Sequence, residues 1–72
     1  MLVNNKETSE GDKAYYIDRE NRIYEATIKS LTEQDGNAFA DLDVDINGTS
    51  TPVENVPHNT SPEKHSWNHS II

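Results

Sequence analysis

A strict alternation of side chains, closed by an Asn-Gly pair, limits the folds open to this chain more than any other pattern in it. Between Ala38 and Ile46 every second residue is apolar, and aspartates occupy three of the positions between them. A period of two is typical of a β-strand with one buried and one solvated face. Asn47-Gly48 follows, the dipeptide best suited to a two-residue hairpin turn. We therefore predict a strand over residues 38–46 with a hairpin turn directly after it.

The same segment also satisfies the spacing of a calcium-binding loop. Residues 43–54 match the pattern D-x-[DN]-x-[DN]-G-x5-E, in which oxygen donors alternate, glycine makes the turn and glutamate closes the coordination shell. Gly36 lies where the entering helix of an EF-hand would have to be established, and Pro57 interrupts the exiting helix. The strand is the favoured interpretation, and the calcium loop remains the alternative.

Further segments have strand character. Residues 13–18 are rich in aromatic and β-branched side chains, which favour strands. Residues 23–31 alternate apolar and polar side chains, which predicts a second strand. A helix competes there, because the apolar residues also fall at spacings of three and four. Residues 32–37 contain Asp-Gly-Asn and predict a turn, and residues 52–56 are suited to a short return strand.

Composition places a single domain in the middle of the chain. Only 32% of the 72 residues are hydrophobic, which is low for a globular domain and leaves both ends outside the core. We expect residues 1–12 to form a flexible arm, residues 13–57 the domain, and residues 58–72 a polar, mostly mobile tail. Trp67 is the large apolar side chain in that tail. It is expected either to fold back over the domain or to dock into a neighbouring subunit.

Charge and cysteine content exclude several functions. The net charge of −7 opposes binding to a phosphate backbone, so nucleic acid is not expected as a direct ligand. Acidic residues dominate the stretch between Lys29 and Lys64, which predicts a negative side of the domain. Without cysteine there is neither a disulfide framework nor a thiolate zinc site. No apolar run is long enough for a signal peptide or a membrane span, so a soluble, cytosolic protein is expected.

Neither a catalytic site nor a cofactor is predicted. The serine and threonine residues fall in turns or in the tail, with no histidine in the predicted domain to activate them. His58, His65 and His69 all lie in the tail and are expected to be solvated rather than to bind a metal. The aspartates between Ala38 and Ile46 lie on an exposed strand face, where carboxylates remain hydrated and ionised.

Three segments together resemble one known type of small domain. Gly11–Tyr16 is suited to a first strand, Tyr24-x-Ala26-x-Ile28 has an aromatic-x-Ala-x-Ile pattern, and Val53–His58 is suited to a short closing strand and turn. Over residues 11–58, about two thirds of the chain, this resembles the Tudor-like and KOW-like small β-barrels, especially those of bacteriophage proteins. The resemblance implies an all-β fold: a small four- to five-stranded Tudor-like barrel with flexible N- and C-terminal arms.

The resemblance also implies a possible binding mode. In Tudor relatives, a cage of aromatic side chains can hold a methylated Lys or Arg through cation–π attraction. The aromatic residues available here for such a cage are Tyr15, Tyr16, Tyr24, Phe39 and Trp67.

The function predicted from these observations is that of a noncatalytic protein-interaction subunit. The leading interpretation is a bacteriophage virion component, for head decoration or head-to-tail joining, located in the virion or the host cytoplasm. Its expected partners are protein subunits of a capsid or connector lattice, without a membrane. The alternatives are an acidic host-directed inhibitor that mimics nucleic acid and a calcium-binding module. The candidate partner-binding residues are Tyr15, Phe39, Asp41, Asp43, Asp45 and Trp67.

Overall fold

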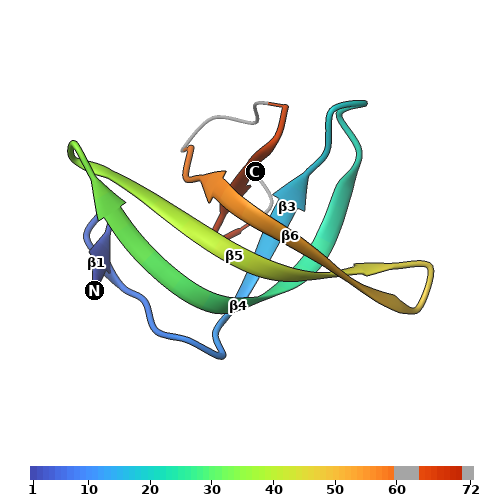
Figure 1. Ribbon diagram of the computed structural model, residues 1–72, viewed down its shortest axis with the longest axis horizontal. Helices are drawn as coiled ribbons and strands as arrows, with labels where there is room; N and C mark the ends of the chain where they lie inside the picture. The colour runs from blue at the N-terminus through green and yellow to red at the C-terminus, as the bar shows by residue number, and fades with distance from the viewer. Residues whose placement is uncertain (60–63, 71–72) are drawn as a thin grey trace.

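A computed structural model describes residues 1–59 and 64–70, and over these residues the fold is all-β, with no helix. A five-stranded antiparallel sheet has the order β6-β5-β4-β3-β7, and β1 and β2 form a separate two-stranded hairpin (Figure 1). The strands are β1 (Leu2–Val3), β2 (Lys6–Glu7), β3 (Lys13–Ile17), β4 (Ile23–Gln34), β5 (Asn37–Ile46), β6 (Thr49–Pro57) and β7 (Ser66–Asn68).

β5 confirms the strand predicted from the alternation. Leu42 and Val44 are completely buried, whereas Asp45 is exposed. Asn47 and Gly48 have φ angles of 53° and 81°, the positive values that a type I′ hairpin turn requires at both central residues. The backbone N–H of Gly48 also donates a 2.9 Å hydrogen bond to Asp45 Oδ1, which fixes the turn.

The calcium-loop alternative is wrong. Residues 43–54 run from the end of β5 through the turn into β6, so neither an entering nor an exiting helix is present. In an extended strand, alternate carboxylates are spread along one face instead of surrounding a point. Throughout residues 1–59 and 64–70, no group of three or more His, Cys, Asp or Glu side chains is placed to hold a metal ion.

β4 is a strand, so the helical alternative for residues 23–31 is wrong. It pairs with β3 on one side and β5 on the other, and this pairing buries Ala26 and Ile28 on one face. β4 continues to Gln34, beyond the predicted end, and β6 begins at Thr49, before the predicted start. The polar residues at these ends pair across the hairpins, which local propensity does not predict.

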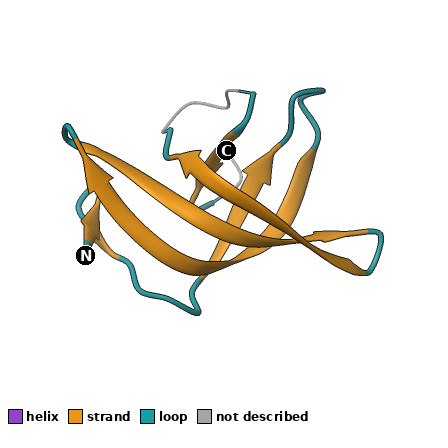
Figure 2. Ribbon diagram, viewed as in Figure 1, coloured by secondary structure: helices purple, strands orange, loops and turns teal. Residues whose placement is uncertain are grey.

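Two irregularities bend the long strands. The register of β4 with β5 shifts between Ile28 and Ser30, and the register of β5 with β6 shifts between Ala40 and Leu42. Bulges of this kind increase the twist of a sheet and bend it locally. The long strands are visibly curved in Figure 2. Their buried residues, among them Ala26, Ile28, Leu42 and Val44, form the hydrophobic core on one face of the sheet.

Trp67 is central to that core. It is the largest of the completely buried side chains, and Leu42, Val44 and Val56 are buried with it. Full burial of a large apolar side chain contributes roughly 1.5–3 kcal/mol, so Trp67 supplies a substantial part of the stability of so small a domain. Of the two interpretations of this residue, folding back is therefore the one that the structure adopts.

Both ends of the chain contain strands where arms were expected. Near the N-terminus, Asn4 and Asn5 have positive φ angles of 52° and 63°, and the tight turn that they make pairs β1 with β2. Near the C-terminus, β7 pairs with β3, with Trp67 opposite Tyr16. This pairing covers an edge of β3 that would otherwise be open. β1, β2 and β7 thus lie outside the predicted domain of residues 13–57; residues 60–63, 71 and 72 of the predicted tail lie outside the described residues.

Candidate partner-binding face

The face of the main sheet that points away from the core brings together polar and acidic side chains from four strands. Cross-strand pairing places Tyr15 opposite Glu25, Thr27 opposite Asp43, and Asp45 opposite Ser50. On β3, β4 and β5 these residues point away from the core because they alternate with buried or half-buried neighbours. Ser50 of β6 lies on the same face because it pairs directly opposite Asp45. We call this surface the outer face, and its members are Tyr15, Glu25, Thr27, Asp43, Asp45 and Ser50.

Asp45 is at the centre of the outer face. Three adjoining shallow depressions on the described part of the molecule all include it in their lining. The first is bordered by Tyr15, Ile23, Tyr24 and Glu25, the second by Lys13, Glu25, Ala26, Thr27 and Asp43, and the third by Thr27, Asp43, Gly48 and Ser50. A continuous shallow surface therefore runs from the aromatic residues of β3 and β4 to the β5–β6 turn.

Negative charge on this surface is only partly compensated. Lys29 Nζ lies 3.8 Å from Asp43 Oδ1, and both side chains are about half exposed, so this pair is weak. Lys13 Nζ donates a long hydrogen bond of 3.4 Å to Thr27 Oγ1. Neither Glu25 nor Asp45 forms an ion pair with any residue in the described ranges. Both carboxylates are exposed and accessible to a cationic partner.

Asp41 has a different role from its two neighbours in the alternation. Its Oδ1 accepts a hydrogen bond of 2.9 Å from the backbone N–H of Asn55, and its Oδ2 accepts one of 2.9 Å from the hydroxyl of Ser30. These donors, the Asn55 N–H foremost, lower the pKa of Asp41 below its usual value of 3.8. One carboxylate thus joins β4, β5 and β6 where both registers shift.

Of the six candidate partner-binding residues, the structure brings Tyr15, Asp43 and Asp45 together on the outer face. Phe39 is half-buried near the other end of β5, between Thr32 and Pro57, and borders none of the three depressions. Trp67 has no exposed surface and so offers none to a partner. With Tyr16 also buried, the five aromatic residues do not line one open cage.

Glu25 is a member of the outer face and Ile23 borders its first depression, but neither is among the predicted partner-binding residues. Glu25 is on the polar side of the alternation in residues 23–31, so the sequence predicts that its side chain points away from the core. What the sequence lacked was the register, which places it opposite Tyr15. Ile23 is 47% exposed, in keeping with its place on the Glu25 side of the strand alternation; only the helical alternative included it in an apolar set. It lies at the start of β4, where the sheet does not cover it.

The three histidines were expected to be solvated residues of the tail, but each of them contacts other parts of the fold. The ring of His58 packs edge-on against Trp67 with 4.8 Å between centroids, and His69 lies 5.3 Å from both rings. His69 Nε2 is 2.8 Å from Thr8 Oγ1, and His65 Nδ1 is 3.1 Å from the hydroxyl of Tyr16. Burial lowers the pKa of each histidine below its ordinary value of 6.5.

Comparison with known proteins assigns no role to the outer face. The chain matches no protein-family model, no curated protein and no solved structure. Among the residues with described positions, none belongs to a helix long and apolar enough to cross a membrane.

Proposed function

We propose that this chain is a noncatalytic protein-interaction subunit whose outer face binds a basic segment of a partner protein. The observation that carries the proposal is the grouping of Glu25, Asp43 and Asp45 around three adjoining depressions, one of which is bordered by Tyr15 and Ile23. Exposed carboxylates steer and orient a cationic partner, while the apolar border supplies surface to bury.

We further propose that the curved sheet closes as a Tudor-like barrel. β6 and β7 are the two edges of the sheet, and a single parallel bridge joins His58, the residue after β6, to Trp67 of β7. The backbone N–H of Asn59 donates a hydrogen bond of 3.0 Å to the carbonyl of Trp67 at the same place. This contact supports closure, because it links the first and last strands in the order of the sheet.

As the biological setting we propose a bacteriophage virion, with head decoration or head-to-tail joining as the role. The resemblance of residues 11–58 to small phage barrels supports this setting. Flexible arms no longer support it, because β1, β2 and β7 are paired within the chain. Contacts with capsid or connector subunits would then use the outer face.

A host-directed inhibitor that mimics nucleic acid is the second candidate. Asp43 and Asp45 occur two residues apart on one strand, with Glu25 on the adjacent strand, so negative charge is repeated along a surface. A basic groove that normally binds phosphates would accept such a surface. Competition distinguishes the two roles: DNA displaces the chain from its partner only if both occupy the same groove.

The test of the proposed function is charge removal on the outer face. Glu25→Gln, Asp43→Asn and Asp45→Asn are combined in one variant, and an extended peptide of alternating lysine and valine is titrated while backbone amide NMR shifts are recorded. Three exposed ion pairs at roughly 0.5 kcal/mol each predict about a tenfold loss of affinity. The matched control combines Glu10→Gln, Asp35→Asn and Glu54→Gln, which remove the same charge elsewhere. Equal losses in the two variants would refute a localised site.

A further inference from the structure

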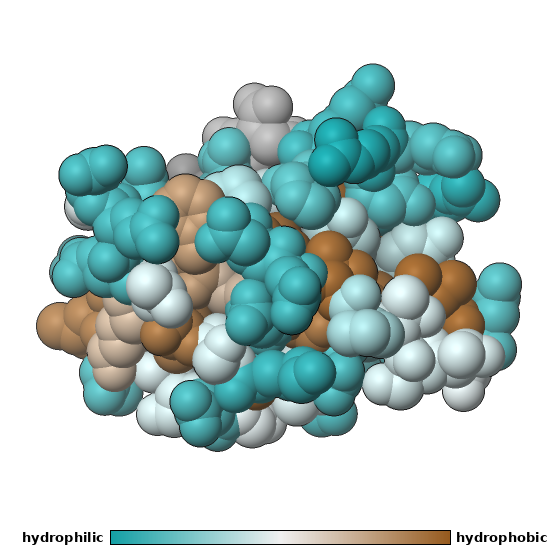
Figure 3. Space-filling model, in the orientation of Figure 1, coloured by the Kyte–Doolittle hydropathy of each residue, from teal (hydrophilic) through white to brown (hydrophobic). Residues whose placement is uncertain are grey.

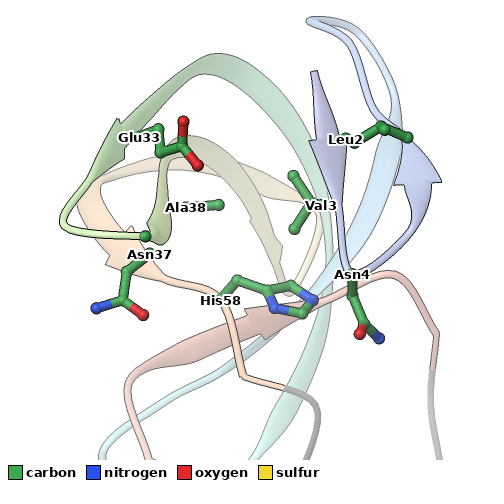
Figure 4. Close-up of a pocket in the computed structure, with 8 residues that line it drawn as sticks. Leu2, Val3, Asn4, Glu33, Asn37, Ala38 and His58 are labelled. Carbon is green, nitrogen blue, oxygen red and sulfur yellow. The ribbon is translucent and has the colours of Figure 1, made fainter.

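A second hollow lies at the other end of β4 and β5, away from the outer face. It has a volume of about 220 Å³, several times the roughly 30 Å³ that one water molecule occupies in the liquid. It is smaller than the roughly 300–1,000 Å³ typical of pockets for drug-sized ligands. The size suits one amino-acid side chain. Its lining, drawn in Figure 4, is Leu2, Val3, Asn4, Glu33, Gly36, Asn37, Ala38 and His58.

Two sides of this pocket come from distant parts of the chain. The N-terminal hairpin supplies one wall, and the β4–β5 turn supplies the other. In Figure 4 the side chains of Val3 and Ala38 point toward each other across the space, and the imidazole of His58 lies below them. Val3 is almost completely buried, so this wall is held by the core. The interior is thus apolar in its middle.

The polar groups of the pocket favour a cation. Glu33 is the only charged side chain among the described residues that line it, and neither Lys nor Arg contributes. Burial lowers the pKa of His58, so its ring is neutral at physiological pH and does not repel a positive charge. Its Nε2 is buried without a hydrogen-bond partner in the described structure, and an unpaired buried polar atom is costly.

Hydrophobic surface continues outside the pocket. Leu2 is 67% exposed, and its side chain points away from the pocket in Figure 4. Figure 3 shows hydrophobic atoms at the surface on the left, the side on which β1 lies in Figure 1. A partner that inserts one side chain into the pocket would bury this apolar surface with its neighbouring residues.

We propose that this pocket binds one cationic side chain of a partner protein, a lysine or an arginine, with its aliphatic stem between Val3 and Ala38 and its charged head at Glu33. The amide groups of Asn4 and Asn37 provide further hydrogen-bonding positions around the head. The attraction is ionic and hydrogen-bonded rather than cation–π, because none of the described lining residues is Phe, Tyr or Trp. The inference rests on the proposed function, since both assume a basic protein partner.

Small probes test the pocket on the full chain without the partner. Nα-acetyl-lysine methylamide is titrated while NMR follows the methyl groups of Val3 and Ala38, and the arginine and norleucine analogues are titrated in the same way. Saturable shifts with a cationic probe, and at least about fivefold weaker binding of the uncharged norleucine analogue, support the proposal. Whichever cationic probe binds more tightly identifies the head group. Equal affinity for norleucine, or no saturable shift at Val3 and Ala38, overturns it.

Variants separate the pocket from the general negative charge. Glu33→Gln should weaken the cationic probe by about fivefold, whereas Glu54→Gln, the matched control on β6, should leave it unchanged. Asp45→Asn, on the outer face, should also leave probe binding unchanged. Retained probe binding in Asp45→Asn supports the pocket even where the proposed function of the outer face fails. Equal weakening by all three substitutions would show that only the overall charge attracts the probe.

Discussion

Three aspartates that look equivalent in the sequence have different roles in the structure. Asp41 accepts hydrogen bonds from the hydroxyl of Ser30 and the backbone N–H of Asn55, whereas Asp43 and Asp45 line the outer face. The alternation correctly predicted that all three point away from the core. The alternation could not distinguish Asp41 from the other two aspartates. Ser30 and Asn55 donate to Asp41 at the places where the strand registers shift, and a β-bulge produces no periodic pattern in the sequence.

We expect Asp41→Asn to destabilise the fold more than Asp43→Asn. The asparagine keeps the shape but turns one acceptor oxygen into a donor, so one of the two hydrogen bonds is lost at a cost of about 1 kcal/mol. Asp43 loses only an exposed pair with Lys29, which costs about 0.5 kcal/mol or less. Urea unfolding midpoints at neutral pH measure the difference. Identical midpoints would contradict the structural role of Asp41.

The pH dependence of Asp41 has a definite sign. Its pKa in the folded chain lies below the 3.8 of a free aspartate, so the carboxylate contributes stability that is fully present above pH 3.8. This contribution is lost as the pH falls through the folded pKa. The unfolding midpoint of the parent should therefore approach that of Asp41→Asn at low pH. A constant gap between them from neutral pH to about pH 2 would argue against hydrogen bonding to the ionised form.

At the scale of elements, the sequence predicted the central strands and missed those at the ends. β4 and β5 alternate over many residues, and that length makes the period visible, whereas β3 is recognisable by its aromatic and β-branched side chains. β7 has only three residues, Ser66–Asn68, which is too short to show any period. Its place is set by the open edge of β3 and by the core position that Trp67 fills, and both are tertiary features.

β7 is therefore expected to be essential for folding. Trp67→Ala removes the largest buried side chain and should cost about 3–5 kcal/mol, most of the stability available to a domain of this size. Circular dichroism during urea unfolding measures the loss. Ser70→Ala, at an exposed position after β7, is the control and should unfold like the parent. A Trp67→Ala chain as stable as the parent would mean that β7 does not complete the core.

For the whole molecule, the histidines join segments that are far apart in the sequence. His69 meets Thr8 across 61 positions, and His65 meets Tyr16 across 49. Composition and spacing indicated a solvated tail, because no local pattern encodes contacts over such separations. The same limit applies to the pocket beside Val3, which forms only when the N-terminal hairpin meets the β4–β5 turn.

This arrangement predicts that moderate acid loosens the contact between the two ends. Each histidine has a folded pKa below 6.5, so between about pH 7 and pH 5 the unfolded chain binds more protons than the folded one. Stability is then full above pH 6.5 and falls as the pH is lowered toward the folded pKa values. The groups that face the histidines are Lys6, Thr8, Asp12, Tyr16, Arg19 and Asn68, together with the His58–His69 pair.

We expect the thermal midpoint, followed by Trp67 fluorescence, to fall over this pH range. Replacing His58, His65 and His69 together by Gln should flatten the profile, because glutamine does not titrate. His69→Gln alone keeps a hydrogen-bonding group for Thr8 and should flatten it in part, which provides a folded variant if the triple substitution unfolds the chain. If His69→Gln and the triple variant lose stability with acid as steeply as the parent, carboxylates rather than histidines cause the loss.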